Sequence, residues 1–397
     1  MLTWLMLFVY IVLVAYIIAR GVHCIRRIHP ILDKKRVIIP AAIAFILACI
    51  PLILGAVVPF GDFRTWCHKF SNFWLGYTIL LVFTLVVVDI IVLILKLINR
   101  KKKLAFLSWK KSYAILCLVT ILLPMAGTIY GYIHSDQLKL AVYEDTVDKS
   151  AGSISELNIV VVSDQHVGYN KGCDYMQQMV DKVNELNPDL VIFAGDIVDN
   201  EYEAIEDPER MAEIFRGIKS KYGVYGIWGN HDVDSILVGG FSVKPNSEQL
   251  RDDRVVQFMK DSGITMLEDE TVLIANSFYI VGRQDGMNNG KGDTSRMAID
   301  ELTSSLDKSK PIICLAHEPN QLDETAAAGV DICISGHTHA GQFFPLTIVQ
   351  PLAWKNYWGE KKFGNMTSYV TSGVGVYGPD MRLFTDSEVM QIKVTFN

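Results

Sequence analysis

Acidic residues are nearly missing from the first third of this 397-residue chain. Residues 1–132 contain fifteen Lys and Arg but three Asp and no Glu, a net charge of +12; the remainder has 22 basic and 40 acidic residues, a net charge of −18, and the two sum to −6. Half of all residues are hydrophobic, and the excess lies in the first part. A single water-soluble globule is therefore excluded, and the chain consists of two physically different parts.

Charged side chains are also absent before Arg20. A cleaved signal peptide begins with basic residues and ends at a site of small residues, and the first apolar stretch shows neither. We therefore expect this stretch to remain part of the protein.

Long apolar stretches dominate the first part. About twenty apolar residues in a helix span the hydrocarbon core of a bilayer, so each is a candidate transmembrane helix. A helix buried in a soluble core is the alternative for any one stretch, but four in succession with basic residues between them favour a membrane domain. The four stretches are Leu2–Ala19, Val37–Val58, Phe73–Leu97 and Tyr113–Ile133.

The basic residues between these stretches predict the orientation. Six Lys and Arg follow the first stretch and six follow the third, whereas Arg64 and Lys69 alone separate the second from the third. Loops rich in Lys and Arg stay in the cytoplasm. We therefore expect a multi-pass protein of the cell membrane, with everything after the fourth stretch on the extracytoplasmic side. Asp89, inside the third stretch, either marks a transport pathway or makes a structural contact with a neighbouring helix.

Cysteines are few and poorly placed for a disulfide framework. Of the seven, Cys314 and Cys333 lie in apolar runs where a buried free thiol is expected. Cys67 and Cys173 could bridge, although free thiols are favoured there too.

The polar residues 134–156 predict a linker between a transmembrane domain, residues 1–133, and a second domain, residues 157–397. From Leu157 onward, short apolar runs alternate with helical patterns. There is no internal repeat. The pattern predicts an α/β fold with a core of two sheets flanked by helices. The expected strands are Asn158–Ser163, Leu190–Ala194, Val224–Trp228, Thr271–Ala275, Phe278–Val281, Pro311–Ala316, Asp331–Ser335, Thr367–Ser372 and Glu388–Phe396.

Polar side chains that bind metals follow five of these strands. Because ligands gather where the carboxyl ends of strands meet, one site is expected to hold them all. Carboxylate oxygens suit Mn or Mg, and imidazoles suit Fe or Zn. Gly195, Gly229 and Gly336 would permit tight turns there, and an extended 337–339 loop would place both of its imidazoles on one side. The candidates are Asp164, His166, Asp196, Asn230, His231, His317, His337 and His339.

The order of these motifs, Asp-x-His, Gly-Asp-x-x-Asp, Gly-Asn-His-Asp, His and Gly-His-x-His, resembles the calcineurin-like metallophosphoesterase family. Within the family, the segments from Gly336 to Gln342 and from Ser372 to Arg382 resemble the membrane-anchored bacterial branch. The resemblance extends over nearly all of residues 158–396. Two departures are Gln165, where an apolar residue is usual, and Ser372-Gly373, which lacks a nearby arginine.

The resemblance implies a pair of divalent ions, with Mn preferred and Fe, Zn or Mg as alternatives. One ion would take Asp164, His166, Asp196 and His339, and the other Asp196, Asn230, His317 and His337. A hydroxide bridging the ions would attack phosphorus, while His231 would protonate the leaving oxygen as general acid.

The sequence leaves two possible roles open for other polar residues near these motifs. Asp199 and Asp232 either orient imidazoles and backbone or cap turns. The segment from Arg283 to Arg296 is either a loop facing the substrate or an exposed flexible connection.

The expected substrates are phosphate mono- or diesters. The membrane part favours lipid-linked or cell-envelope esters and contacts with membrane lipids, and the charge of −18 argues against nucleic acid as a partner. Two alternatives stay open: a metal-stabilised membrane sensor or scaffold without catalysis, and a transport element with an accessory esterase. The sequence does not predict an oligomeric state.

Overall fold

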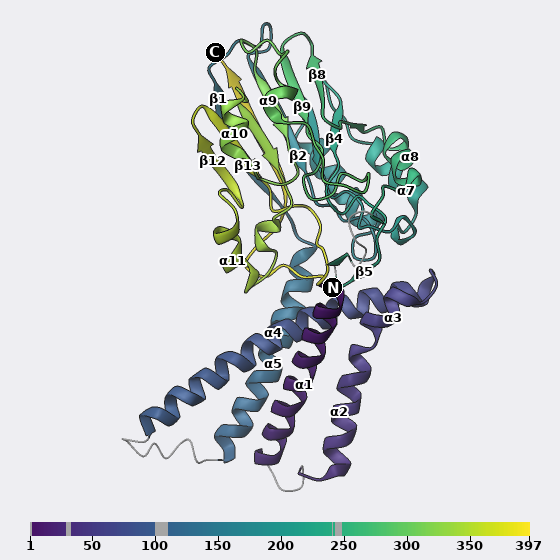
Figure 1. Cartoon of the computed structure of the whole chain (residues 1–397), viewed down its shortest axis with the longest axis vertical. Coiled ribbons are helices and arrows are strands. Elements are labelled where there is room, and N and C mark those ends of the chain that lie inside the picture. Colours follow the sequence, from purple (N-terminus) through teal and green to yellow (C-terminus); the bar gives the residue numbers. More distant parts are fainter. Residues whose placement is uncertain (1, 29–32, 100–109, 240, 243–247) are drawn as a thin grey trace. The chain divides into compact units, whose positions relative to one another are not determined.

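The computed structural model describes residues 2–28, 33–99, 110–239, 241–242 and 248–397 (Figure 1). The chain divides into two compact units. The first comprises residues 1–133 with two short later segments, 238–243 and 378–381, and the second comprises residues 134–237, 244–377 and 382–397.

The first unit is helical. Four stretches of it, Phe8–Arg26, Lys35–Val57, Asp62–Leu95 and Ala114–Ser135, are long and apolar enough to cross a membrane, as the sequence predicted. The helices are α1 (Leu2–Ile28), α2 (Lys35–Cys49), α3 (Pro51–Val57), α4 (Asp62–Asn99) and α5 (Lys110–Ser135).

Two boundaries in this unit differ from the sequence prediction. The second stretch is divided at Pro51, which begins α3 as its first residue, because proline lacks the N–H needed inside a helix. Helix α4 begins eleven residues earlier than the predicted Phe73, at Asp62. Its first turns are too polar to read as a span, but their aromatic rings stack at helical spacing, with 5.9 Å between Phe63 and Trp66 and 5.3 Å between Trp66 and Phe70.

The basic segments are only partly described. Helix α1 extends through Arg20 and Arg26, which were expected in a loop. Residues 100–103, which supply four of the basic residues after the third stretch, lie outside the described residues.

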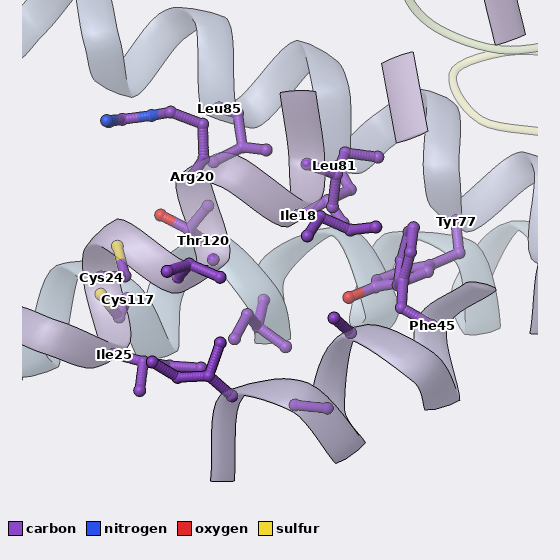
Figure 2. Close-up of a pocket in the computed structure, with 17 residues that line it drawn as sticks. Ile18, Arg20, Cys24, Ile25, Phe45, Tyr77, Leu81, Leu85, Cys117 and Thr120 are labelled. Carbon is purple, nitrogen blue, oxygen red and sulfur yellow. The ribbon is translucent and has the colours of Figure 1, made fainter. Parts of the chain in front are cut away.

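Asp89 makes a structural contact within the helices. The Arg20 guanidinium donates to its carboxylate, and the Tyr16 hydroxyl donates to Asp89 Oδ2 at 2.9 Å. Close by, helices α1, α2, α4 and α5 surround a cavity of about 270 Å³ whose lining is almost entirely apolar (Figure 2). Asp89 is therefore paired with side chains of a neighbouring helix, which is the structural one of its two interpretations.

The second unit contains two six-stranded sheets. With neighbouring strands hydrogen-bonded to each other, the first sheet runs β1-β14-β2-β3-β4-β7 across its width, and the second runs β12-β13-β11-β10-β9-β8. Strands β2, β3, β4 and β7 are parallel, as are β9, β10, β11 and β13. The strands are β1 (Leu138–Val147), β2 (Glu156–Val162), β3 (Leu190–Ala194), β4 (Val224–Ile227), β5 (Leu237–Val238), β6 (Phe241–Ser242), β7 (Thr265–Met266), β8 (Glu270–Ile274), β9 (Phe278–Gly282), β10 (Ile312–Leu315), β11 (Ile332–Ser335), β12 (Gly359–Phe363), β13 (Met366–Val370) and β14 (Ser387–Phe396).

The second unit also contains helices. They are α6 (Cys173–Glu185), η2 (Tyr202–Ala204), α7 (Pro208–Arg216), α8 (Asp253–Asp261), α9 (Ile299–Leu302), α10 (Leu322–Ala327), η4 (His339–Gly341) and α11 (Leu346–Ala353). Of these, α6, α7 and α8 pack on the first sheet, and α9 and α10 pack on the second.

Successive side chains along the strands point to opposite faces of the sheets, and this produces three apolar cores. Ile159 on β2 packs with Ile313 on β10 between the sheets, while its neighbour Val160 packs with α6, α7 and α8 on the opposite face. On the outside of the second sheet, Cys314 packs against α9 and α10. The side-chain period of two along a strand produces this separation. The predicted fold, two sheets flanked by helices, is confirmed.

Strand β1 was not predicted, because the polar residues 134–156 indicated a linker. It pairs in parallel with β14 over ten residues, from Leu138 opposite Ser387 to Val147 opposite Phe396. Because β1 is an edge strand, alternate side chains face solvent and polar residues occur among them, so the segment lacks the apolar run by which other strands were predicted.

All seven cysteines, including Cys67 and Cys173, are free thiols.

Candidate metal centre

The eight predicted site residues lie where five parallel strands end. Asp164 and His166 follow β2, Asp196 follows β3, Asn230 and His231 follow β4, His317 follows β10, and His337 and His339 follow β11. Because these strands are parallel within each sheet, their carboxyl ends meet at one edge.

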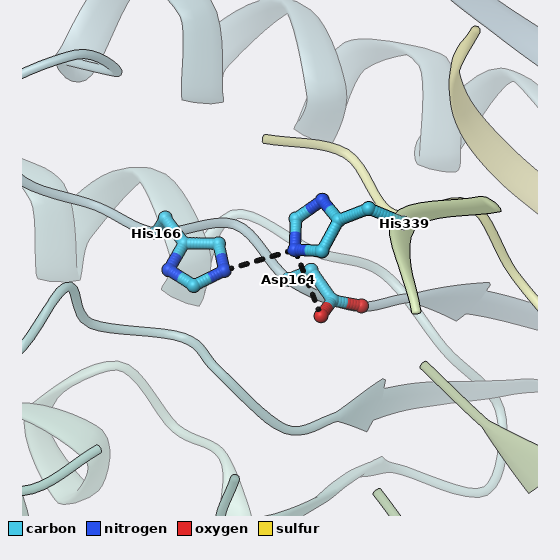
Figure 3. A group of neighbouring side chains, drawn as sticks. All are labelled: Asp164, His166 and His339. Carbon is cyan, nitrogen blue, oxygen red and sulfur yellow. Dashed lines mark hydrogen bonds and ion pairs between the residues drawn. The ribbon is translucent and has the colours of Figure 1, made fainter. Parts of the chain in front are cut away.

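A first group of ligand atoms surrounds His166 Nε2. It lies 3.1 Å from His339 Nε2 and 3.8 Å from Asp196 Oδ2, and His339 Nε2 is 3.3 Å from Asp164 Oδ1. Figure 3 shows the two imidazoles and the Asp164 carboxylate turned toward one another. Nitrogen and oxygen atoms that converge in this way can hold a divalent cation.

A second group surrounds His317. Its Nδ1 donates to the carbonyl oxygen of Ala194 at 2.7 Å, which leaves Nε2 facing Asp196 Oδ2 at 3.0 Å. His337 Nδ1 lies 2.9 Å from Asn230 Oδ1, and the rings of His317 and His337 are 5.2 Å apart. Asp196, His317 and His337 can therefore hold a second cation, with Asn230 close enough to contribute its amide oxygen.

His231 lies between the two groups. Its backbone N–H donates to Asp196 Oδ1 at 2.7 Å, and its ring is 4.9 Å from that of His166. Its Nδ1 lies 2.7 Å from Asn200 Oδ1, so the opposite nitrogen, Nε2, is available for a ligand. The ring is partly exposed, with 14% of the side chain accessible.

Asp199 and Asp232, two carboxylates beside the proposed ligands, have different roles. Asp199 Oδ1 lies 3.4 Å from His166 Nδ1 and 3.5 Å from His231 Nδ1, so Asp199 orients imidazoles. Asp232 instead accepts the backbone N–H groups of Ile197, Val198 and Gly229, so it caps a turn.

The backbone at the site is left-handed at five non-glycine residues. The φ values are 53° at Asp164, 44° at His166, 51° at Asp196, 68° at His337 and 49° at His339. This region is unfavourable for residues with a Cβ, and such strain is concentrated at functional sites.

The loop 337–339 is not extended, so that prediction is wrong. Thr338 has helical backbone angles between two left-handed histidines, and the chain then turns into η4. The tight turn sends His337 to the group with His317 and His339 to the group with His166.

Two glycines are required by close approach. A Cβ on Gly229 would lie 2.2 Å from Asp196 Oδ1, and one on Gly195, where φ is +94°, would lie 2.5 Å from His317 Nδ1. Any side chain at either position would displace a site residue.

Residues 157–341 match the calcineurin-like phosphoesterase family. The chain carries a metallophosphoesterase domain. At the level of the domain, this confirms the predicted family and the predicted class of metal-dependent phosphoric ester hydrolase.

Three proteins with related sequences show how far the similarity extends along this chain. A zebrafish (Danio rerio) transmembrane protein with metallophosphoesterase domain is 29% identical over 82% of this chain and 73% of its own length. An uncharacterized metallophosphoesterase of Helicobacter pylori is 30% identical over 64% of this chain and 62% of its own length. Another, from Campylobacter jejuni, is 25% identical over 82% and 81%. The chain thus spans less than two thirds of the Helicobacter relative.

The phosphoesterase site fits divalent metal ions by an observation independent of this match. Although it lies 3.0 Å from Asp196 Oδ2, the buried His317 Nε2 makes no hydrogen bond with any described residue, a costly state unless a ligand satisfies this nitrogen. Nitrogen and carboxylate oxygen are the donors that such ions prefer.

Asp164 and Asp196 are ionised, as a carboxylate that binds a metal ion must be. Burial opposes the ionisation of Asp164 and Asp196, but neighbouring imidazoles outweigh it. His339 holds the pKa of Asp164 below its usual value, and His317 and His231 hold the pKa of Asp196 well below its usual value.

The imidazoles divide into two classes. Burial lowers the pKa of His337 to about 3 and that of His339 to about 4, so both are neutral at pH 7. Burial also disfavours the cations of His317 and His231, but the charge of Asp196 prevails. It raises the pKa of His317 well above its usual value, and together with Asp199 it raises that of His231 to about 9.

Sequence reasoning missed two aromatic side chains beside this site. Trp354 lies 5.3 Å from the His337 ring, and Tyr377 lies 4.9 Å from the His339 ring. Arg382, fully buried, donates to the carbonyl oxygens of Ser372, Gly373 and Gly375.

The segment from Arg283 to Arg296 is not an exposed connection throughout. Arg283, Asp285, Asn288 and Asn289 are buried, and Asp285 accepts the backbone N–H groups of Met287 and Asn288. Gln165, the other departure from the family pattern, is also buried, and its amide has no partner among the described residues.

Proposed function

We propose that this protein is a membrane-anchored phosphoesterase that uses a pair of divalent ions, with Mn preferred, to hydrolyse phosphate mono- or diesters. One ion would be held by Asp164, His166, Asp196 and His339, and the other by Asp196, Asn230, His317 and His337. The observation that carries the proposal is the position of Asp196, whose Oδ2 lies 3.0 Å from His317 Nε2 and 3.8 Å from His166 Nε2. One carboxylate therefore reaches both groups.

Bound ions would supply Lewis acidity: they activate water and offset the charge that develops on phosphoryl oxygens. The chain's own residues do the rest. Asp164 and Asp196 neutralise the cations, and the strained backbone at the strand ends fixes the positions of the ligands.

His231 would act as the general acid. Although burial opposes protonation, the Asp196 and Asp199 carboxylates raise the pKa of its ring to about 9, and its Nδ1 contact with Asn200 leaves Nε2 to face a substrate. Donation of the ring proton to the leaving oxygen would account for a factor of roughly 10² to 10⁴ in rate.

The four apolar helices support a membrane location, and the basic residues between them favour an extracytoplasmic phosphoesterase domain. Such a domain would meet lipid-linked or cell-envelope esters at high local concentration.

The test is hydrolysis of chromogenic phosphate mono- and diesters by the full-length chain in detergent micelles, with Mn added or removed by chelator, beside the Asp196→Ala variant. We expect metal-dependent turnover that the substitution abolishes. A wild-type chain that binds two equivalents of metal but hydrolyses no ester would contradict catalysis and favour a sensor or scaffold.

A further inference from the structure

Helix α11 is unusual in the second unit because none of its residues is buried. Its eight residues include no charged side chain, and its large apolar side chains are exposed: Leu352 by 85%, Ile348 by 59% and Val349 by 54%. A helix that is apolar and uncovered in water is unfavourable, so its surroundings in the working protein must be apolar.

A second segment adds to the same surface. Phe384 is 79% exposed, and its ring meets that of Phe344, just before α11, at 6.1 Å and 89°. We call Phe344, Ile348, Val349, Leu352 and Phe384 the α11 patch. Large exposed apolar patches mark contacts with membranes, ligands or partners.

The α11 patch is joined to the metal centre at both ends of α11. At its start, Gly341 of η4 approaches Thr347 so closely that a Cβ on the glycine would lie 2.7 Å from Thr347 backbone atoms. At its end, Trp354 is 5.3 Å from the His337 ring, and Thr338 Oγ1 donates to the Tyr357 carbonyl oxygen at 2.6 Å. The loop that carries two site histidines thus also positions α11.

The chemistry of the α11 patch fits lipid hydrocarbon. The helix lacks charge, whereas Trp358, which follows its C-terminal end, is 49% exposed, and tryptophan is enriched where hydrocarbon meets headgroups. The same chain carries four stretches apolar enough to cross a bilayer, so a bilayer is the apolar medium to which the chain is tied.

We infer that the α11 patch enters the hydrocarbon of the bilayer and guides an amphiphilic phosphate ester, with its chain along α11 and its phosphate at the metal centre. The substrate part of this inference rests on the proposed function, whereas the lipid contact does not.

The lipid contact is tested without any substrate. A Leu352→Cys chain carrying an environment-sensitive fluorophore is placed in phosphatidylcholine vesicles whose acyl chains bear doxyl quenchers. Leu273→Cys on β8, also exposed, is the matched control, and the wild-type chain measures the background from its own cysteines. We expect quenching at position 352 and none at 273. An unquenched label at 352 would overturn the inference and show that water or another part of the protein covers α11.

The substrate class is tested with pairs of esters in which one member carries long hydrocarbon chains and the other does not: phosphatidic acid against glycerol 3-phosphate, and hexadecyl against methyl 4-nitrophenyl phosphate. Ile348→Asp/Leu352→Asp should lower kcat/KM about tenfold or more for the long-chain ester, because two aliphatic contacts are lost, and leave the short-chain ester within about twofold. Leu273→Asp should change neither.

Equal losses on both members of a pair, or no loss on either, would overturn the role of α11 in substrate binding. A wild-type chain that hydrolyses neither pair would instead refute the proposed function, and the quenching result would still decide whether α11 contacts lipid.

Discussion

Asp196 and His231 are neighbours in the site, but the proposed function gives them different tasks. Asp196→Ala removes the carboxylate that reaches both groups, so we expect metal content to fall by about half or more and turnover to vanish. His231→Ala removes a ring outside both proposed ligand sets. It should leave the metal content unchanged and slow turnover by roughly 10² to 10⁴.

Elemental analysis of both purified variants, followed by kinetics, measures this difference. Equal metal loss in the two variants would contradict the role assigned to His231.

Protonation of His317 predicts a pH dependence of metal binding. Asp196 raises the pKa of His317 well above its usual value, so the protonated form persists to higher pH. Because a metal needs the free Nε2, that proton must leave. Affinity should therefore increase as pH rises from about 6 to about 8, with proton release on binding.

Titration calorimetry in buffers of different ionisation enthalpy counts the released protons. His317→Gln should bind metal more weakly and release fewer protons. An affinity that does not vary over this pH range would refute the prediction.

Strand β1 is the longest of the five described strands that the sequence did not predict, and it makes part of the expected linker a structural component of the sheet. Tyr143 on β1 meets Tyr369 on β13 at 5.4 Å, whereas its neighbour Val142 is 48% exposed. Tyr143→Ala should therefore lower stability by about 1 to 2 kcal/mol, through a lost aromatic pair and lost burial. Val142→Ala should cost about 0.5 kcal/mol or less.

Thermal unfolding of the full-length variants in micelles compares them. Equal unfolding midpoints would mean that β1 is not part of the cooperative fold. The domain boundaries at residues 133 and 157 stay a prediction.

At the scale of the whole molecule, the charge of the basic segments predicts where the phosphoesterase domain resides. In sealed right-side-out membrane vesicles, added protease should digest this domain without detergent, because Lys- and Arg-rich loops remain in the cytoplasm. Inside-out vesicles from the same cells are the control and should protect it. The reverse pattern would place the domain in the cytoplasm and remove the argument for envelope substrates.

Much of this protein is determined by the sequence alone. The lengths of the apolar stretches predict the membrane-spanning helices, and short apolar runs predict nine of the fourteen strands that the structure describes, because both signals are local and need no knowledge of neighbours. The residues Asp164, Asp196 and His317 could be selected as site residues because each directly follows such a strand.

Tertiary structure decided the rest. Which histidine joins which carboxylate depends on the left-handed turn at His337 and His339, and the positions of Trp354 and Arg382 depend on loops that return to the site. The pairing of β1 with β14 joins residues some 250 positions apart. Contacts between distant residues leave no periodic signal in the chain, since they arise only when the sheets pack. The exposure of α11 is likewise invisible in its sequence, because an apolar run of eight residues reads as buried until its neighbours are known.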